Sequence, residues 1–286
     1  MPFCKMPFIR YDNYNLGRNI MMMINWYTYL KLSFNRLIHG HKLYKLDFNK
    51  SGLWVVLNNG VRLKYLDKFN SISSTITTYG SFEEQELQQV MNNLKSRSVF
   101  FDVGANVGLY SLMVANNFID MDIYSFEPLP ETMKELRENL KESNLHGNSI
   151  HLIQSAISNY DGFVNITSDL HSSNYITTPD SKINHLSVPC TTIDIFVKNN
   201  NIKKLDFIKI DVEGKEDLVL EGAMDSLRKF KPILLIELIE KNKDFLDRIS
   251  ATPEVSINKL LNLGYKYTRL DDSTDQSFHN YLFYFD

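Results

Sequence analysis

The sequence predicts an α/β fold in which helices cover both faces of a mostly parallel, doubly wound sheet. From residue 98 onward, short apolar segments alternate with segments of helical spacing, which is the pattern of successive β-α-β units. Residues 232–237 form an almost continuous apolar run, as expected for a strand that is covered on both faces. A glycine-containing turn, Gly104–Gly108, connects the first of these strands to the helix that follows.

The expected elements follow from this alternation. Strands are expected at 98–103, 122–126, 149–154, 205–210, 232–237, 265–270 and 281–285, and helices at 107–118, 130–143, 215–230 and 256–263. No helix precedes the last strand, so we expect it to run antiparallel. The less regular region 157–192 is expected to contain a hairpin around Asp161-Gly162.

The first 78 residues differ in pattern and are predicted to form an N-terminal extension that shapes a substrate pocket or an interaction surface. Residues 53–57 and 61–65 flank Asn58-Asn59-Gly60, which predicts a β-hairpin. The polar patch 70–78 is expected to be a boundary, so the predicted domain covers residues 79–286. The apolar run Ile20–Ile24 is far shorter than the roughly 20 residues needed to cross a bilayer. A buried helix is expected there, with peripheral membrane or partner contact as the alternative.

Composition narrows the class of protein. The chain has 286 residues, 43% of them hydrophobic, and a formal net charge of -3, so a nucleic-acid partner is not expected. Cys4 and Cys190 form no C-x-x-C pair, so no zinc motif is indicated. We see no secretory signal and expect a reducing, cytoplasmic location.

The turn at 102–108 reads DVGANVG and predicts a nucleotide site. Gly104 and Gly108 allow a tight turn and a close approach to a ligand at the carboxyl edge of the sheet. The spacing is neither G-x-G-x-x-G nor the phosphate-binding GxxxxGK[ST], and Asn106 stands where a dinucleotide site has glycine. A glycine-rich turn without a ligand is the alternative.

Acidic residues end two of the expected strands. Glu127, 23 residues after Gly104 (127 − 104), lies where a carboxylate accepts the ribose hydroxyls of an adenosine. Asp211 ends the apolar run 205–210 beside Lys209. The acids that follow, Glu213 and Glu216, are explained by a helix N-terminus. Residues 154–158 can lie along an adenine edge, although a plain strand-to-loop turn explains them equally well.

Together these segments resemble the FkbM family of class I methyltransferases over about residues 79–285. The matching segments are DVGANVG (102–108), FEP (126–128), SAISNYDG (155–162), TIDIF (192–196) and KIDVEGKEDLVLEGA (209–223). The resemblance implies a Rossmann-like sheet of seven strands and S-adenosyl-L-methionine as cofactor. It also implies a small-molecule or glycan acceptor, namely a hydroxyl of a sugar, glycolipid or secondary metabolite.

The resemblance also assigns roles to residues. The glycine loop would lie beneath the methionine and ribose, Glu127 would hold the ribose hydroxyls, and Asp211 would face the methionine amine or the acceptor. The implied cofactor site comprises Asp102, Gly104, Ala105, Asn106, Gly108, Glu127, Pro128, Ser155, Ala156 and Asp211.

Methylation of a hydroxyl needs a general base. Asp211 is the first candidate, Glu237 the second and the loop residue His171 the third, with Lys209 completing the catalytic group. As an alternative, Asp211 and Glu237 would hold a divalent cation, although two carboxylates are not a full ligand set. His185 lies in the same weakly matched loop region, 170–186.

Two other function classes stay open at this point. An NAD(P)-dependent oxidoreductase would use the same sheet and the same ribose acid, but G-x-G-x-x-G is absent. A non-catalytic module that binds an adenosine nucleotide is the other alternative.

Overall fold

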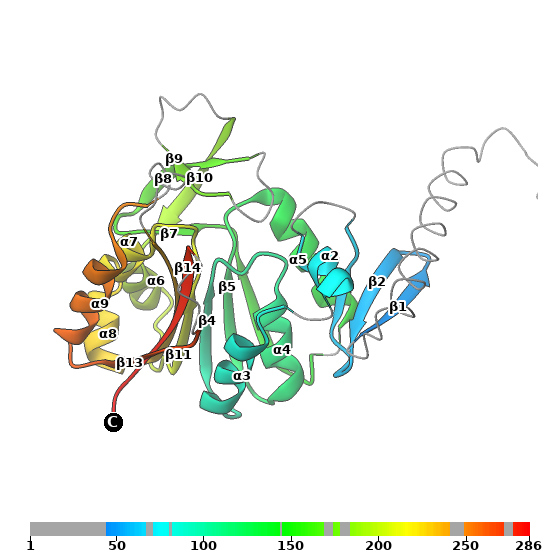
Figure 1. The fold of residues 1–286 in the computed structure, drawn as a ribbon, viewed down its shortest axis with the longest axis horizontal. Coiled ribbons are helices and arrows are strands. Elements are labelled where there is room, and N and C mark those ends of the chain that lie inside the picture. The colour runs from blue at the N-terminus through cyan, green and yellow to red at the C-terminus, as the bar shows by residue number, and fades with distance from the viewer. Residues whose placement is uncertain are drawn as a thin grey trace, which may run out of the picture.

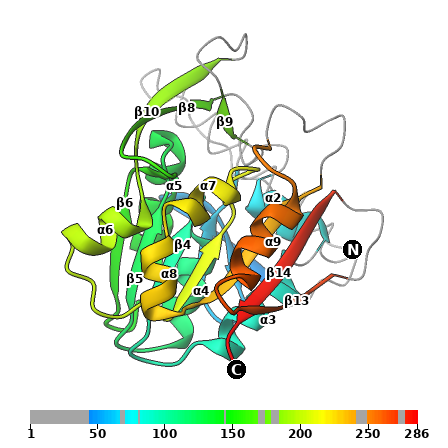
Figure 2. The same cartoon turned by 90° about the vertical axis from the view of Figure 1, so that its left-hand side faces the viewer.

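The computed structural model describes residues 44–66, 71–79, 82–143, 145–168, 174–177, 184–240, 249–271 and 277–286. These residues form a seven-stranded sheet between two layers of helices, together with a four-stranded and a three-stranded sheet (Figures 1 and 2). Among the described helices, none has the length and hydropathy that a membrane span requires.

The large sheet has the strand order β13-β14-β12-β11-β4-β5-β6. Its strands are β4 (Val99–Val103), β5 (Asp122–Phe126), β6 (Ser149–Ile153), β11 (Phe207–Ile210), β12 (Ile233–Ile239), β13 (Lys266–Arg269) and β14 (Phe278–Tyr284). The pairs among β6, β5, β4, β11 and β12 are parallel, whereas β14 pairs antiparallel with both β12 and β13. The predicted mostly parallel, seven-stranded sheet with an antiparallel last strand is therefore confirmed.

Both faces of this sheet are apolar because successive side chains of a strand point to opposite faces. Phe100 packs in a cluster with α3 (Glu84–Asn93) and α4 (Leu109–Asn117). Phe101 packs in a second cluster with α6 (Ile193–Asn199), α7 (Glu216–Glu221), α8 (Met224–Phe230) and α9 (Pro253–Leu261). Helix α5 (Pro130–Glu142) packs Met133 and Leu136 against the glycine loop.

The predicted single helix 215–230 is wrong, because Gly222 ends α7 before α8 begins. A Cβ atom at residue 222 would lie 2.2 Å from the carbonyl oxygen of Ser158 and 2.9 Å from Cβ of Thr192. The chain therefore approaches the Ser158 backbone at a distance that only glycine allows, and the helix is interrupted there.

The predicted hairpin around Asp161-Gly162 is also wrong. The described strands between residues 156 and 191 form a separate sheet in the order β7-β10-β8-β9. Strand β10 (His185–Thr191) lies between β7 (Ala156–Ile157) and β8 (Gly162–Thr167), parallel to the first and antiparallel to the second. This arrangement packs apolar side chains from all three strands into one cluster. Strand β9 (Ile176–Thr177) pairs with the free edge of β8.

The predicted N-terminal hairpin is confirmed. Strands β2 (Gly52–Leu57) and β3 (Arg62–Lys64) pair antiparallel, with Gly60 at a φ of 92° in the turn. A further strand, β1 (Tyr44–Asn49), pairs with β2. Buried side chains of this sheet join the cluster around α3 and α4. The apolar run Ile20–Ile24 lies outside the described residues.

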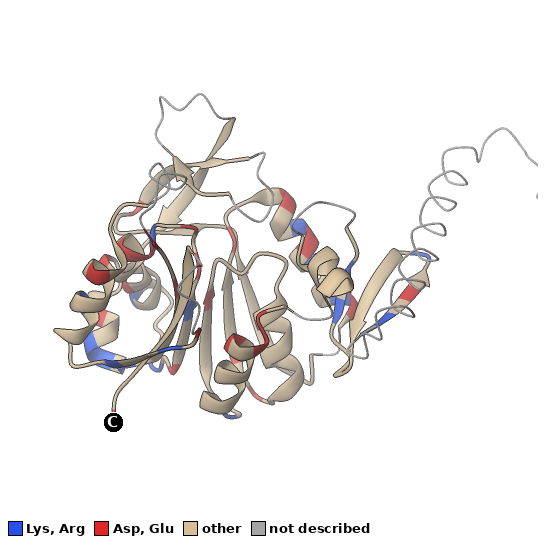
Figure 3. Cartoon of the chain, in the orientation of Figure 1, with Lys and Arg blue, Asp and Glu red and all other residues tan. Residues whose placement is uncertain are grey.

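The polar patch 70–78 is mostly helix, since α2 spans Ile72–Tyr79. Ile72 and Ile76, four residues apart, are both buried and form the apolar face of this helix. The division at residue 78 remains a prediction. Acidic and basic residues are mixed over the described elements, for example along α5 (Figure 3).

Candidate active site

The glycine loop lies at the carboxyl end of β4 and is bent by three residues with positive φ: Gly104 (79°), Asn106 (51°) and Gly108 (88°). A Cβ atom at residue 104 would lie 1.8 Å from the Asp211 carbonyl oxygen, and one at residue 108 would lie 2.0 Å from Leu136 Cδ1. The two glycines are therefore required because β11 and α5 pack directly against the loop.

A cavity opens beside this loop, at the carboxyl ends of β4, β5, β6 and β11; we call it the loop cavity. The space inside it, together with its open mouth, amounts to about 680 Å³. It is lined by Val103, Gly104, Asn106, Phe126, Glu127, Pro128, Leu129, Thr132, Ser155, Ala156, Ile157, Ile166, Asn174, Ile176, Asp211, Val212 and Glu213. Seven of the predicted cofactor residues are in this set.

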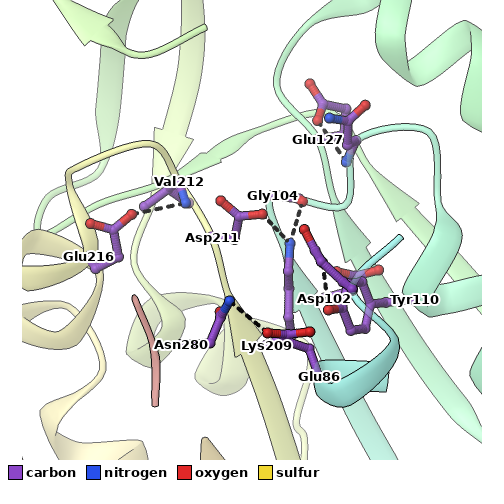
Figure 4. A network of polar contacts seen from close by, with 12 residues as sticks. Glu86, Asp102, Gly104, Tyr110, Glu127, Lys209, Asp211, Val212, Glu216 and Asn280 are labelled. Carbon is purple, nitrogen blue, oxygen red and sulfur yellow. Dashed lines mark hydrogen bonds and ion pairs between the residues drawn. The ribbon is translucent and has the colours of Figure 1, made fainter. Parts of the chain in front are cut away.

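Glu127 is the acidic residue of the loop cavity that is most enclosed by protein, with 6% of its surface exposed. Its carboxylate oxygens accept hydrogen bonds from the backbone N–H of Asn106 (3.0 Å) and of Leu129 (2.9 Å) (Figure 4). Burial raises the pKa of Glu127 to about 7, although these two hydrogen bonds act in the opposite direction. The carboxylate is thus held rigidly at the cavity wall and keeps lone pairs for a ligand's hydroxyl groups.

A second cavity adjoins the first across the glycine loop; we call it the acidic cavity. It is lined by Ile72, Phe82, Glu83, Gly104, Ala105, Asn106, Leu109, Tyr110, Lys209, Asp211, Glu213, Glu237 and Phe278. The two cavities share Gly104, Asn106, Asp211 and Glu213. The predicted residues Ala105, Lys209 and Glu237 lie here, so the structure brings the catalytic candidates Lys209 and Glu237 next to the loop cavity.

Lys209 connects β11 to the glycine loop. Its Nζ donates to the Gly104 carbonyl oxygen (3.0 Å) and to Asp211 Oδ2 (2.9 Å) (Figure 4), and it lies 5.2 Å from the centre of the Tyr110 ring. Burial alone would lower the pKa of Lys209, but the carboxylates of Asp211 and Asp102 outweigh it and the pKa is raised. Lys209 is therefore charged, and it holds Asp211 at the junction of the cavities.

Asp102 and Gly108 line neither cavity as the described residues define them. Asp102 is fully buried, and its Oδ2 accepts from the backbone N–H (3.1 Å) and the hydroxyl (2.6 Å) of Ser111. Its Oδ1 has no hydrogen-bond partner among the described residues. Asp102 thus anchors the start of α4 through Ser111, and cofactor contacts of Asp102 and Gly108 remain predictions.

Two residues of the acidic cavity were missed by sequence reasoning, Glu83 and Tyr110. The Tyr110 hydroxyl donates to Glu83 Oε2 (2.6 Å). Burial, followed by the charge of Asp211, raises the pKa of Glu83 to about 7. Nothing in the local sequence distinguishes Glu83 from Glu84 and Glu86, so no signal in the pattern identifies it.

Other predicted residues lie elsewhere. His171 is outside the described residues, and His185 begins β10 and lines a groove beside α5. Among the described residues, no group of three or more His, Cys, Asp or Glu side chains is arranged to hold a metal ion. Asp211, one of the two expected metal ligands, is bonded to Lys209 instead.

The comparison with protein families decides the assignment. The family model for the methyltransferase FkbM domain matches residues 102–267. The chain belongs to the FkbM methyltransferase family. The predicted family and the predicted methyl-transferring activity are thus confirmed, and the oxidoreductase alternative loses its support.

Individual relatives agree with this family. The chain is 25% identical over 169 residues to Methyltransferase 1 of Beauveria bassiana, covering 52% of this chain and 67% of the relative. It is 22% identical over 153 residues to hexuronic acid methyltransferase AglP of Haloferax volcanii, spanning 54% of this chain and 61% of that protein. The crystal structure of methyltransferase FkbM from Methylobacillus flagellatus matches with a TM-score of 0.50 at 17% identity, over 74% of this chain and 52% of the other, and supports the fold.

Proposed function

We propose that this methyltransferase uses S-adenosyl-L-methionine to methylate a hydroxyl group of a sugar, glycolipid or secondary metabolite. The observation that carries the proposal is the pair of cavities that meet at the glycine loop. One presents a buried carboxylate, Glu127, for an adenosine, and the other presents Asp211 and Glu237 for an acceptor. The hexuronic acid substrate named for the Haloferax volcanii relative supports a sugar acceptor.

The lining of the loop cavity supports an adenosine site. Pro128, Leu129, Ala156 and Ile176 give it apolar walls that suit a flat purine. Glu127 provides the acceptor that two ribose hydroxyls need. When bound, S-adenosyl-L-methionine supplies a methyl group carried on a positively charged sulfur.

The chain's own contribution is to position the acceptor and to take its proton. Asp211 lines both cavities, which supports a role for its carboxylate beside the reacting hydroxyl. Burial and the nearby charges of Asp211 and Glu83 raise the pKa of Glu237 well above its ordinary value. The direction of this shift favours the protonated form of Glu237, which can donate a hydrogen bond to the acceptor and leaves Asp211 as the base.

Asp211→Asn tests this assignment. Asparagine keeps the size of the side chain and an oxygen for Lys209 but removes the base, so turnover should fall by about 10²- to 10⁴-fold with the fold intact. Turnover is measured by mass spectrometry of candidate glycans incubated with methyl-labelled cofactor. The control is Asp225→Asn on α8, an exposed carboxylate paired with Arg228. Wild-type rates in Asp211→Asn would remove this residue from the mechanism.

Glu127→Ala tests the ribose contact. The affinity for S-adenosylhomocysteine should fall by about 1–3 kcal/mol, because hydrogen bonds to a charged group are lost. Because burial raises the pKa of Glu127, the ionised carboxylate destabilises the folded protein. Its removal should therefore leave the variant folded. Calorimetric titration measures the affinity, with Glu254→Ala, an exposed carboxylate on α9, as the control. Equal affinity in wild type and Glu127→Ala would refute the ribose role.

A further inference from the structure

The acidic cavity holds more carboxylates than cations. Glu83, Asp211 and Glu213 line it together with one lysine, Lys209, while Glu237 is left out of this comparison because its raised pKa favours the uncharged form. That lysine is already bonded to Asp211. The cavity joins the loop cavity at the glycine loop, so a ligand that extends from one to the other enters a region of excess negative charge. Such a region favours a cationic group of the ligand.

Glu83 is held in this cavity by an unusual local structure. It is the residue before α3 and adopts the left-handed region, with a φ of 48° and a ψ of 46°. Its side chain makes no capping hydrogen bond to the helix; its Oε2 instead accepts from the Tyr110 hydroxyl at 2.6 Å. Non-glycine residues in this region cost stability and occur disproportionately at functional sites. The Glu83 carboxylate thus lies at the cavity and does not cap α3.

The proposed cofactor supplies a matching group. S-adenosyl-L-methionine consists of an adenosine and a methionine tail that carries an α-ammonium group. With the ribose at Glu127, the tail reaches the acidic cavity across Gly104, which lines both cavities. We propose that Glu83 binds the α-ammonium group of the methionine tail. This inference rests on the proposed function and adds a binding residue that precedes the matched family segment, 102–267.

The electrostatics of the cavity agree with this assignment. Burial and then Asp211 raise the pKa of Glu83 to about 7, while Lys209 and Tyr110 oppose the shift and Glu86 adds slightly to it. An ammonium group favours the ionised carboxylate and lowers that pKa. Below about pH 7 the tail must therefore displace a proton from Glu83, and affinity for the tail should increase as the pH rises through 7.

Calorimetry with two ligands separates the contribution of the methionine tail to affinity from that of the adenosine. S-adenosylhomocysteine carries the amino-acid tail, whereas 5′-methylthioadenosine has the same adenosine and a thioether but no amino-acid group. Glu83→Gln keeps an oxygen for Tyr110 and removes the charge, so affinity for S-adenosylhomocysteine should fall roughly 10- to 100-fold. Affinity for 5′-methylthioadenosine should be unchanged. Glu84→Gln, the same substitution at the adjacent exposed residue, should change neither affinity.

The wild-type protein provides a second test that needs no variant. The ratio of the affinity for S-adenosylhomocysteine to the affinity for 5′-methylthioadenosine should rise between about pH 6 and 8. Titration of Glu127 changes both affinities, whereas titration of Glu83 changes only the affinity for S-adenosylhomocysteine. Near pH 6.5, titrations in buffers of different ionisation enthalpy should show proton release for S-adenosylhomocysteine in excess of that for 5′-methylthioadenosine. A pH-independent ratio, or equal losses for both ligands in Glu83→Gln, would overturn the inference. Wild-type protein that binds neither ligand would instead overturn the proposed function.

Discussion

Gly104→Ala should abolish cofactor binding and destabilise the fold by about 2–4 kcal/mol, the combined cost of a positive φ and of overpacking. The new Cβ would lie 1.8 Å from the Asp211 carbonyl oxygen. That oxygen belongs to the backbone at the end of β11, where the Asp211 N–H donates to the Val103 carbonyl oxygen at 3.1 Å. A shift of either strand end would displace Gly104 or Asp211, both of which line the two cavities.

Gly147→Ala is the matched control. Gly147 has the same φ, 79°, but a Cβ atom there meets no heavy atom within 4 Å. This variant therefore measures the backbone strain alone, about 1 kcal/mol, and should bind the cofactor normally. Urea unfolding and calorimetric titration of both variants separate the strain from the clash. If the two alanine variants lose the same stability and both bind S-adenosylhomocysteine, the close approach of loop and β11 is not what requires glycine.

Lys209→Met should destabilise the protein by about 3–5 kcal/mol at neutral pH, since it leaves buried carboxylates without their cation. Methionine matches the length of the lysine stem, so packing is largely retained. Asp102 is fully buried and Asp211 is bonded directly to Lys209. Lys204→Met is the control, because Lys204 pairs with Asp206 at 3.0 Å with about half of its side chain exposed, and it should cost less than about 1 kcal/mol.

The loss of unfolding free energy in Lys209→Met should become smaller as the pH falls. Lys209 opposes the raised pKa of Asp102, so its removal raises that folded-state pKa further while the unfolded value stays the same. A carboxyl whose folded pKa lies above its unfolded pKa destabilises the protein at higher pH, and this penalty disappears as the pH falls toward the unfolded value. Urea unfolding at about pH 8 and about pH 5 should therefore show a smaller difference in unfolding free energy between variant and wild type at the lower pH. An unchanged gap would contradict the charge-based account of Lys209.

The large sheet was predictable because its signals are local. Each parallel strand is a short apolar run between a helix and a turn, and the DVGANVG segment marks the first strand end. Glu127 and Asp211 could be predicted because they directly follow strands, and parallel strands bring their carboxyl ends to one edge of the sheet. Their positions at the two cavities follow from the same rule.

The remaining features depend on contacts between distant segments. Strand β10 separates β7 from β8 although it comes later in the chain, and no turn signal indicates this order. The break at Gly222 depends on the approach of the Ser158 backbone. Glu83 enters the site through a hydrogen bond to Tyr110, 27 residues away, so its position cannot be deduced from its neighbours in sequence.

Calorimetric titration of the wild-type protein tests the central claim most directly. With Glu127 in the loop cavity and Asp211 at its junction with the acidic cavity, S-adenosyl-L-methionine and S-adenosylhomocysteine should each bind at one site per chain, whereas NAD should not bind. Absence of binding by both sulfur nucleotides would contradict the account.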